Sequence, residues 1–157
     1  MIFNIDLIKN TGAERLLFNI VSMHPHSFGG IISIVDTGSP RTIISASAAS
    51  KLKISATGEK ASPIYGFGRG NIPCRKLNNF KFIIKSSEGK TKSIEMPVYV
   101  VDIPALNNLS QEMKISAYRI DSIIGLDFLI SQKMKMVVDF NNNLSYFEEI
   151  YNKNILT

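Results

Sequence analysis

Hydrophobic and polar residues alternate along this chain as short apolar runs separated by turn-forming residues. The runs are rich in Ile, Val and Phe, which favours strands over helices. We predict strands at Phe3–Ile8, Leu16–Val21, Ile31–Val35, Thr42–Ile44, Pro63–Tyr65, Asn71–Pro73, Phe80–Lys85, Ile94–Val101, Asp121–Gly125, Met134–Phe140 and Leu144–Glu148. The stretches SSEG and NNN between neighbouring runs are typical of hairpin turns.

Two stretches have the pattern of short helices. Ser47–Leu52 begins with a serine that can cap a helix. Leu126–Gln132 carries Leu126, Phe128, Leu129 and Ile130, a pattern consistent with a short helix on the core. A polar connector at Leu106–Ser116 could hold a further short helix. Because no long helix or linker interrupts the series, we predict one mainly β domain over residues 1–157, a closed barrel or folded-over sheet.

Composition narrows the class of protein. The chain has 157 residues, of which 45% are hydrophobic and 20% charged, so it can bury a core. Lys and Arg outnumber Asp and Glu by 18 to 13, but this surplus is spread out, and Lys85–Lys92 is predicted to be a polar turn. Nucleic-acid binding is therefore disfavoured. No apolar window of about 18 residues and no signal-peptide pattern is present, which predicts no membrane span and a cytoplasmic protein.

Cysteine and histidine offer little chemistry. Cys74 is the single cysteine, so no disulfide can form within the chain, and we expect a small buried side chain. His24 and His26 lie in MHPHSFGG with no carboxylate or cysteine beside them to complete a metal site. We expect them in a surface loop, and we predict neither a metal nor a cofactor.

The most informative residue is Asp36. It follows the apolar run Ile31–Val35 directly and is followed by Thr37, Gly38 and Ser39. A carboxylate at the end of a buried strand is costly unless it is hydrogen-bonded or functional. The hydroxyls and the glycine could surround it with donors, but D-T-G-S is also rich in turn formers. The residues alone leave two interpretations open, a functional acid and an Asx-type turn.

Three features in order resemble the retropepsin-like, single-lobe aspartic proteases over Leu16 to about Phe147. Asp36-Thr37-Gly38-Ser39 between two apolar strands resembles their active-site loop. Ile123-Ile124-Gly125 is similar to the element that passes behind this loop and supports it. The glycine-rich stretch IYGFGRG, residues 64–70, resembles the flap that closes over substrate. Ser39 and Pro40 depart from the Gly-Ala usual in viral members, and Met1–Arg15 and Glu149–Thr157 lie outside the resemblance.

The resemblance implies a closed barrel with a flap hairpin and an aspartic endopeptidase that activates water between two carboxylates. Asp36 is the one aspartate in an Asp-Thr-Gly context, so the second carboxylate would come from Asp36 of a homodimeric partner. Thr37 would reach the partner's loop, and Ser39 would donate to the Asp36 carboxylate. Ile123, Ile124 and Gly125 would support the loop. The flap residues would be Ile64, Tyr65, Gly66, Phe67 and Gly68.

Several residues are expected to play no part in the reaction. Asp127 is interpreted as structural, and Arg69, Glu148 and Glu149 as solvated. The cleft of such a fold predicts extended peptide substrates with bulky apolar side chains. Two alternatives are kept: a non-catalytic peptide-binding or dimerisation module with the same fold, and a basic protein associated with nucleic acid.

Overall fold

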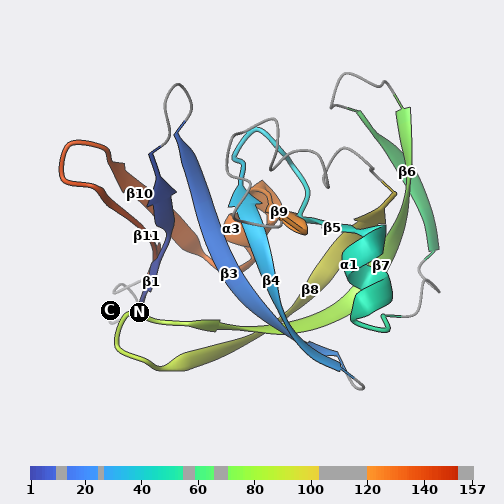
Figure 1. Ribbon diagram of the computed structural model, residues 1–157, viewed down its shortest axis with the longest axis horizontal. Helices are drawn as coiled ribbons and strands as arrows, with labels where there is room; N and C mark the ends of the chain where they lie inside the picture. The colour runs from blue at the N-terminus through green and yellow to red at the C-terminus, as the bar shows by residue number, and fades with distance from the viewer. Residues whose placement is uncertain (10–13, 25–26, 55–58, 66–70, 103–119, 152–157) are drawn as a thin grey trace, which may run out of the picture.

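The residues that the structure describes form two β-sheets and two short helices. The computed structural model describes residues 1–9, 14–24, 27–54, 59–65, 71–102 and 120–151 (Figure 1). Its strands are β1 (Ile2–Asn4), β2 (Asp6–Ile8), β3 (Arg15–His24), β4 (Ser27–Val35), β5 (Ile43–Ser45), β6 (Glu59–Tyr65), β7 (Asn71–Lys85), β8 (Thr91–Val101), β9 (Ser122–Ile124), β10 (Met134–Asp139) and β11 (Leu144–Glu149). The helices are α1 (Ala46–Lys51) and α3 (Leu126–Ser131).

The larger sheet closes on itself to form a barrel. Its strand order is β2-β3-β4-β9-β5-β8-β7-β6, and an additional pairing joins β3 to β7. The ring therefore contains β3, β4, β9, β5, β8 and β7, while β2 and β6 extend from it. Most of the neighbouring strands are antiparallel, but β4 pairs with β9 and β5 pairs with β8 in parallel. The predicted mainly β barrel is confirmed.

A long hairpin, β7–β8, forms one wall of the barrel and curves across the bottom of Figure 1. The sequence predicted separate strands at Asn71–Pro73 and Phe80–Lys85, but β7 runs without a break through both. Asn78 and Asn79, between them, occupy a bulge, where the register with β8 shifts between Leu77 and Phe80. A bulge keeps the strand paired while it bends, so a polar interruption does not end it. The SSEG turn is present, with Gly89 at φ 81°.

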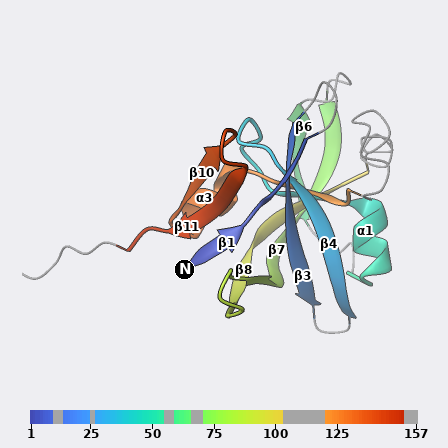
Figure 2. The ribbon, with the colours of Figure 1, turned by 60° about the vertical axis from the view of Figure 1, so that its left-hand side comes forward.

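The smaller sheet has the order β1-β11-β10. The single strand predicted at Phe3–Ile8 is wrong: β1 pairs with β11 in this sheet, and β2 pairs with β3 in the barrel. Between them, Ile5 donates its N–H to the carbonyl of Ser145 at 2.9 Å. The N-terminal residues thus connect the two sheets, and Figure 2 shows β1 beside the β10–β11 hairpin.

The two helices lie close to their predicted positions. The predicted cap at Ser47 is wrong, because Ser47 lies inside α1; the side chain of Ser45 caps the helix instead by accepting the N–H of Ala48 at 3.0 Å. In α3, Phe128 is fully buried, whereas Ile130 is 75% exposed and Leu126 is 37% exposed. The predicted short helix on the core is confirmed, and it packs there through Phe128 and Leu129. A six-residue helix has fewer than two turns, so its buried face accommodates few side chains.

The core lies inside the barrel and continues under the smaller sheet. Aromatic rings connect the two regions, because Phe18 lies 4.9 Å from Phe147 edge-on and Phe128 lies 5.4 Å from Phe147. All three of these side chains are at most 3% exposed. Cys74 is buried as predicted, at 6% exposure. Met134, the first residue of β10, is buried in the same core.

Candidate active site

Asp36 stands at the end of β4, where the chain leaves the barrel. Its N–H donates to the carbonyl of Ile124 on β9 at 3.0 Å, and its own carbonyl accepts the N–H of Ser39 at 3.1 Å. Residues 36–39, called the DTGS loop below, therefore form a tight turn anchored on β9. Val35 is buried, whereas Asp36 is exposed, so the chain changes from core to solvent within one residue.

The Asx-type turn left open by the sequence is present. Asp36 Oδ1 accepts the N–H of Gly38 at 2.9 Å. A Cβ on Gly38 would lie 3.1 Å from the same oxygen, which is tighter than ordinary packing, so a glycine lets the amide approach. The turn fixes the direction of the carboxylate while the side chain remains exposed. The turn and a functional acid are therefore compatible here.

The hydroxyl of Ser39 has a different partner from the expected one. It donates to the carbonyl of Arg41 at 2.7 Å, so its single proton is not directed at Asp36. The sequence predicted that Ser39 donates to the Asp36 carboxylate. In the structure the loop folds back toward Arg41, and the hydroxyl donates there instead. Thr37 is exposed beside Asp36 at the outer edge of the loop.

Strand β9 lies behind the DTGS loop and holds both of its ends. Val35 pairs with Ile124 in the parallel β4–β9 ladder, and Ile43 pairs with Ile123 in the antiparallel β5–β9 ladder. Ile123 and Ile124 are at most 3% exposed. The predicted support by the Ile123-Ile124 pair thus corresponds to a strand inserted between the two strands that flank the loop.

Gly125 follows this strand at a point with no room for a side chain. A Cβ there would lie 2.5 Å from the carbonyl oxygen of Arg41 and 2.8 Å from that of Ser39. Real Cβ atoms do not approach backbone oxygens so closely, so glycine is required by space. In addition, the N–H of Leu126 donates to the carbonyl of Ser39 at 2.8 Å. Helix α3 therefore begins directly against the loop.

Thr42 is the residue that the sequence interpretation missed. Its hydroxyl donates to Asp127 Oδ1 at 2.6 Å and its N–H donates to Oδ2 at 2.9 Å. The hydroxyl oxygen also accepts the N–H of Gly125 at 3.2 Å, and Asp127 Oδ1 accepts the N–H of Phe128 at 2.8 Å. Asp127 is structural, as predicted. The signal in the sequence was a hydroxyl just after the loop together with a carboxylate two residues after Gly125.

A cleft of about 560 Å³ opens beside Asp36. It is lined by Asp36, Gly38, Ser39, Pro40, Arg41, Ile43, Ser62, Pro63, Ile64 and Ile123. These residues come from the DTGS loop with the residues after it, from β9 and from β6. The predicted flap residue Ile64 lies on β6 and lines the cleft, and Tyr65 pairs with Asn71 across the β6–β7 hairpin. The remaining flap residues, Gly66, Phe67 and Gly68, lie outside the described residues, as does Arg69.

Other candidate chemistry is sparse in the described part of the chain. His24 ends β3, and His26 lies outside the described residues. No group of three or more His, Cys, Asp or Glu side chains that could hold a metal ion occurs among the described residues. None of the helices in those same residues is long and apolar enough to cross a membrane.

Comparison with known proteins gives structural likeness without sequence likeness. No protein-family model matches the chain. No curated protein matches it either. A retropepsin-like aspartic protease from Rickettsia conorii superposes with a TM-score of 0.54 at 16% identity, covering 95% of this chain and 89% of that one. EIAV protease in complex with the inhibitor HBY-793 gives 0.50 at 20% identity, covering 83% and 100%.

A further structure, the retroviral protease-like domain of Ddi1 from Leishmania major, gives a TM-score of 0.49 at 15% identity, covering 88% of this chain and 98% of that domain. The barrel closed through β3 and β7 and the strand β9 behind the DTGS loop agree with the architecture that the sequence resemblance implied. The chain has the closed-barrel, single-lobe fold of the retropepsin-like aspartic proteases.

Proposed function

We propose that this protein is an aspartic endopeptidase that works as a homodimer. The observation that carries the proposal is the position of Asp36. Its carboxylate is exposed in an otherwise mainly apolar cleft, and its backbone is fixed by β9 through a 3.0 Å hydrogen bond to Ile124. An acid placed rigidly in a groove of this size is suited to catalysis on a bound peptide. A merely structural Asx turn would not require a cleft beside it.

The homodimer follows from the number of carboxylates. Among the described residues that line the cleft, Asp36 is the only acid. Hydrolysis between two carboxylates needs a second one, and a two-fold axis beside the DTGS loop would place Asp36 of one subunit next to Asp36 of its partner. Thr37 and Gly38 are exposed on the same loop and would meet the partner's loop at that axis.

The proposed reaction uses one proton shared by the two carboxylates. The ionised carboxylate removes a proton from a water molecule held between them, and that water attacks the carbonyl carbon of the scissile peptide. The protonated carboxylate donates its proton to the carbonyl oxygen. The resulting diol then collapses, its C–N bond breaks, and the leaving nitrogen takes up a proton. The contribution of this chain is to hold each Asp36 in a fixed direction through Gly38, Ile124 and Gly125.

The proposed substrate is an extended peptide with apolar side chains near the cleavage site. Ile43, Ile64 and Ile123 line the cleft, together with Pro40 and Pro63. Removing apolar side chains from water against such a surface supplies binding energy that polar peptides would lack. We assign Ile64 and Tyr65, with Gly66, Phe67 and Gly68, to a flap that covers the bound peptide. This assignment rests on the position of β6 along one side of the cleft.

The test is peptide hydrolysis by the purified chain, with Asp36→Asn as the control. A protein substrate and a library of apolar peptides are incubated between about pH 4 and pH 7, the range in which a shared proton can persist. We expect cleavage that pepstatin inhibits and that Asp36→Asn abolishes without loss of the folded dimer. Equal turnover by the wild type and Asp36→Asn would refute the proposal.

A non-catalytic peptide-binding module remains the second candidate. The hydrogen bond from Gly38 to Asp36 Oδ1 favours it, because it gives the acid a conformational role that needs no reaction. Such a module would bind the apolar peptides of the library at the same cleft and leave them intact. Binding measured together with hydrolysis on the same peptides separates the two candidates.

A further inference from the structure

Arg41 holds a fixed position beside Asp36 in the cleft. It lies between the DTGS loop and β5 and is half-buried. The carbon of its guanidinium group lies 4.5 Å from the centre of the Tyr99 ring, and Nη1 donates to the carbonyl of Ser62 on β6 at 3.1 Å. The stacking and the hydrogen bond act on the same planar group. A guanidinium held in this way loses little further freedom when it binds a ligand.

The charge of this guanidinium is not neutralised within the described part of the chain. Arg41 takes part in none of the ion pairs found there. A guanidinium carries five N–H donors; one of them donates to the carbonyl of Ser62, and the group also interacts with the side chain of Cys74. Stacking on Tyr99 covers a face of the group and leaves its edge available for hydrogen bonds. A partly desolvated arginine edge is well matched to a carboxylate, which can accept two parallel hydrogen bonds.

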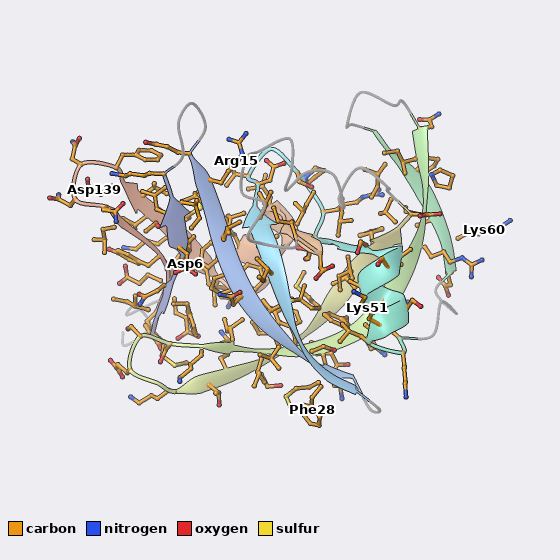
Figure 3. The ribbon with its side chains drawn as sticks, in the orientation of Figure 1. Asp6, Arg15, Phe28, Lys51, Lys60 and Asp139 are labelled. Carbon is orange, nitrogen blue, oxygen red and sulfur yellow. The ribbon has the colours of Figure 1, made fainter. Side chains whose placement is uncertain are left out.

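The surroundings strengthen the attraction for an anion. A second pocket of about 600 Å³ shares one lining residue, Pro63, with the cleft. Lys60 and Arg75 line this second pocket with a single acid, Asp102, among its described lining residues. Figure 3 shows Lys60 at the outer edge of β6. The described lining of this second pocket therefore carries more basic than acidic side chains, which favours an anion in its vicinity.

We propose that Arg41 binds an acidic side chain of the substrate, so that the cleft selects peptides with a glutamate or aspartate within a few residues of an apolar cleavage site. This inference rests on the proposed function, because it assigns the substrate of that same cleft. The competing role for Arg41 is purely structural: it would fasten β6 to the loop and have no preference among peptides.

The experiment compares peptides that differ only in charge. Starting from an apolar peptide that the wild type cleaves, each position on either side of the cleaved bond is replaced in turn by Glu and by Gln. We expect one position at which the Glu peptide has a kcat/KM about fivefold above that of the Gln peptide, as for a partly exposed ion pair with charge-assisted hydrogen bonds. Raising the salt concentration from about 0.05 M to about 1 M should reduce this ratio, because salt screens the attraction.

Variants of Arg41 are judged by the same ratio, which does not depend on how much total activity remains. Arg41→Gln should lower the Glu-to-Gln ratio to about one, and Arg41→Lys should keep part of it because the charge remains. Arg41→Glu should favour a Lys peptide at the same position. The matched control is Lys81→Gln, which removes one positive charge from an exposed site on β7 that pairs with Glu95. This control should leave the ratio unchanged.

The outcomes separate this inference from the proposed function. Cleavage with no Glu preference at any position would overturn the role of Arg41 and leave the endopeptidase intact. Absence of all cleavage would overturn the endopeptidase, and fluorescence anisotropy of the same labelled peptides would then decide about Arg41. Tighter binding of the Glu peptide that Arg41→Gln abolishes would support the acidic subsite, and equal binding of both peptides would refute it. The salt arm needs only the wild-type protein and shows whether the preference is electrostatic, and Arg41→Lys, which keeps the charge and most of the side chain, tests Arg41 itself where Arg41→Gln does not fold.

Discussion

Thr42 and Asp127 are joined by two hydrogen bonds across 85 residues of sequence, at 2.6 Å from the hydroxyl and 2.9 Å from the N–H of Thr42. The pair fastens the chain just after the DTGS loop to the first turn of α3. Because Gly125 and Phe128 also donate into it, the pair connects the loop, the end of β9 and the helix in one network. Thr42 is 1% exposed, so the network is largely shielded from water.

The first prediction concerns this network. Thr42→Val keeps the shape of the side chain but removes the hydroxyl, which leaves Asp127 Oδ1 with one donor fewer and the N–H of Gly125 without its acceptor. We expect a loss of about 1–3 kcal/mol in the free energy of unfolding, together with a fall in activity, because a buried polar group is left unpaired. Urea denaturation measures the first effect and peptide hydrolysis the second.

Thr91→Val serves as the control for that experiment. Thr91 is exposed at the start of β8, so the same change of atoms should alter stability by less than about 0.5 kcal/mol. A double-mutant cycle with Asp127→Asn should show coupling with Thr42→Val, since the two residues share hydrogen bonds. Additive effects would mean that the pair does not act as a unit.

The second prediction tests the space behind the loop. Gly125→Ala would place a Cβ 2.5 Å from the carbonyl oxygen of Arg41, so the loop or the start of α3 must move. We expect strong loss of hydrolytic activity at substrate saturation, because a displacement of about 1 Å at a catalytic group can cost about 100-fold in rate. Circular dichroism of the same variant reports whether the barrel itself remains folded.

Gly30→Ala is the matched control for this change. Gly30 lies in the same barrel on β4, and a Cβ there would meet nothing within 4 Å. Its activity should stay within about twofold of the wild type, as expected for a substitution outside a packed site. A Gly125→Ala protein as active as Gly30→Ala would show that the loop tolerates displacement, which would weaken the assignment of β9 as its support.

Sequence reasoning located the DTGS loop and β9 because both are contiguous stretches with a distinctive order of residues. It did not find Thr42, because Thr42 and its partner Asp127 lie 85 residues apart, and neither stretch alone indicates the pairing. The break between β1 and β2 was missed for a similar reason. The run Phe3–Ile8 indicates which residues are apolar, but it does not indicate that the chain passes from one sheet to the other at Ile5. Long-range pairing decides such features, and local pattern does not.

The sequence did not predict which charged side chains near the C-terminal end of β11 are buried. Glu149 was expected to be solvated, but its side chain is 12% exposed and pairs with Lys92. Glu148, one residue earlier, is 36% exposed and pairs with Lys135. The two neighbouring glutamates point to opposite faces of β11, as residues in a strand do, and only one face is covered. The sequence shows two adjacent acids and does not show which face β8 covers.

The third prediction follows from Glu149. Partial burial alone would raise the pKa of this carboxyl, but hydrogen bonds from Lys92, Tyr151 and the ammonium of Met1 outweigh that effect and lower the pKa from 4.5 to about 2. A carboxyl whose pKa is lower in the folded state than in the unfolded state stabilises the fold at any pH above its unfolded-state pKa. This stabilisation, up to about 3 kcal/mol from the size of the shift, should be lost as the pH falls from about 4.5 to about 2.

Thermal unfolding as a function of pH checks this expectation. Glu149→Gln should be less stable than the wild type at neutral pH, and the difference should shrink as the pH falls through that window. Glu95→Gln is the control, because Glu95 is 49% exposed in its pair with Lys81 and such pairs contribute little. Parallel pH profiles for the wild type and Glu149→Gln would show that this carboxyl is not responsible for the acid sensitivity.

The last prediction tests whether two copies of Asp36 form one catalytic centre. Wild-type chains are mixed with Asp36→Asn chains in equal amounts and allowed to exchange subunits at constant total concentration. If each centre needs both carboxylates, random pairing leaves about one quarter of the activity of undiluted wild type, because only the wild-type homodimers react. Independent subunits would leave about one half. Mixing with Glu88→Gln, an exposed residue of the β7–β8 turn, should cause no loss. The dependence on the square of the wild-type fraction distinguishes a shared centre from a self-sufficient one, since no property of a single subunit produces it.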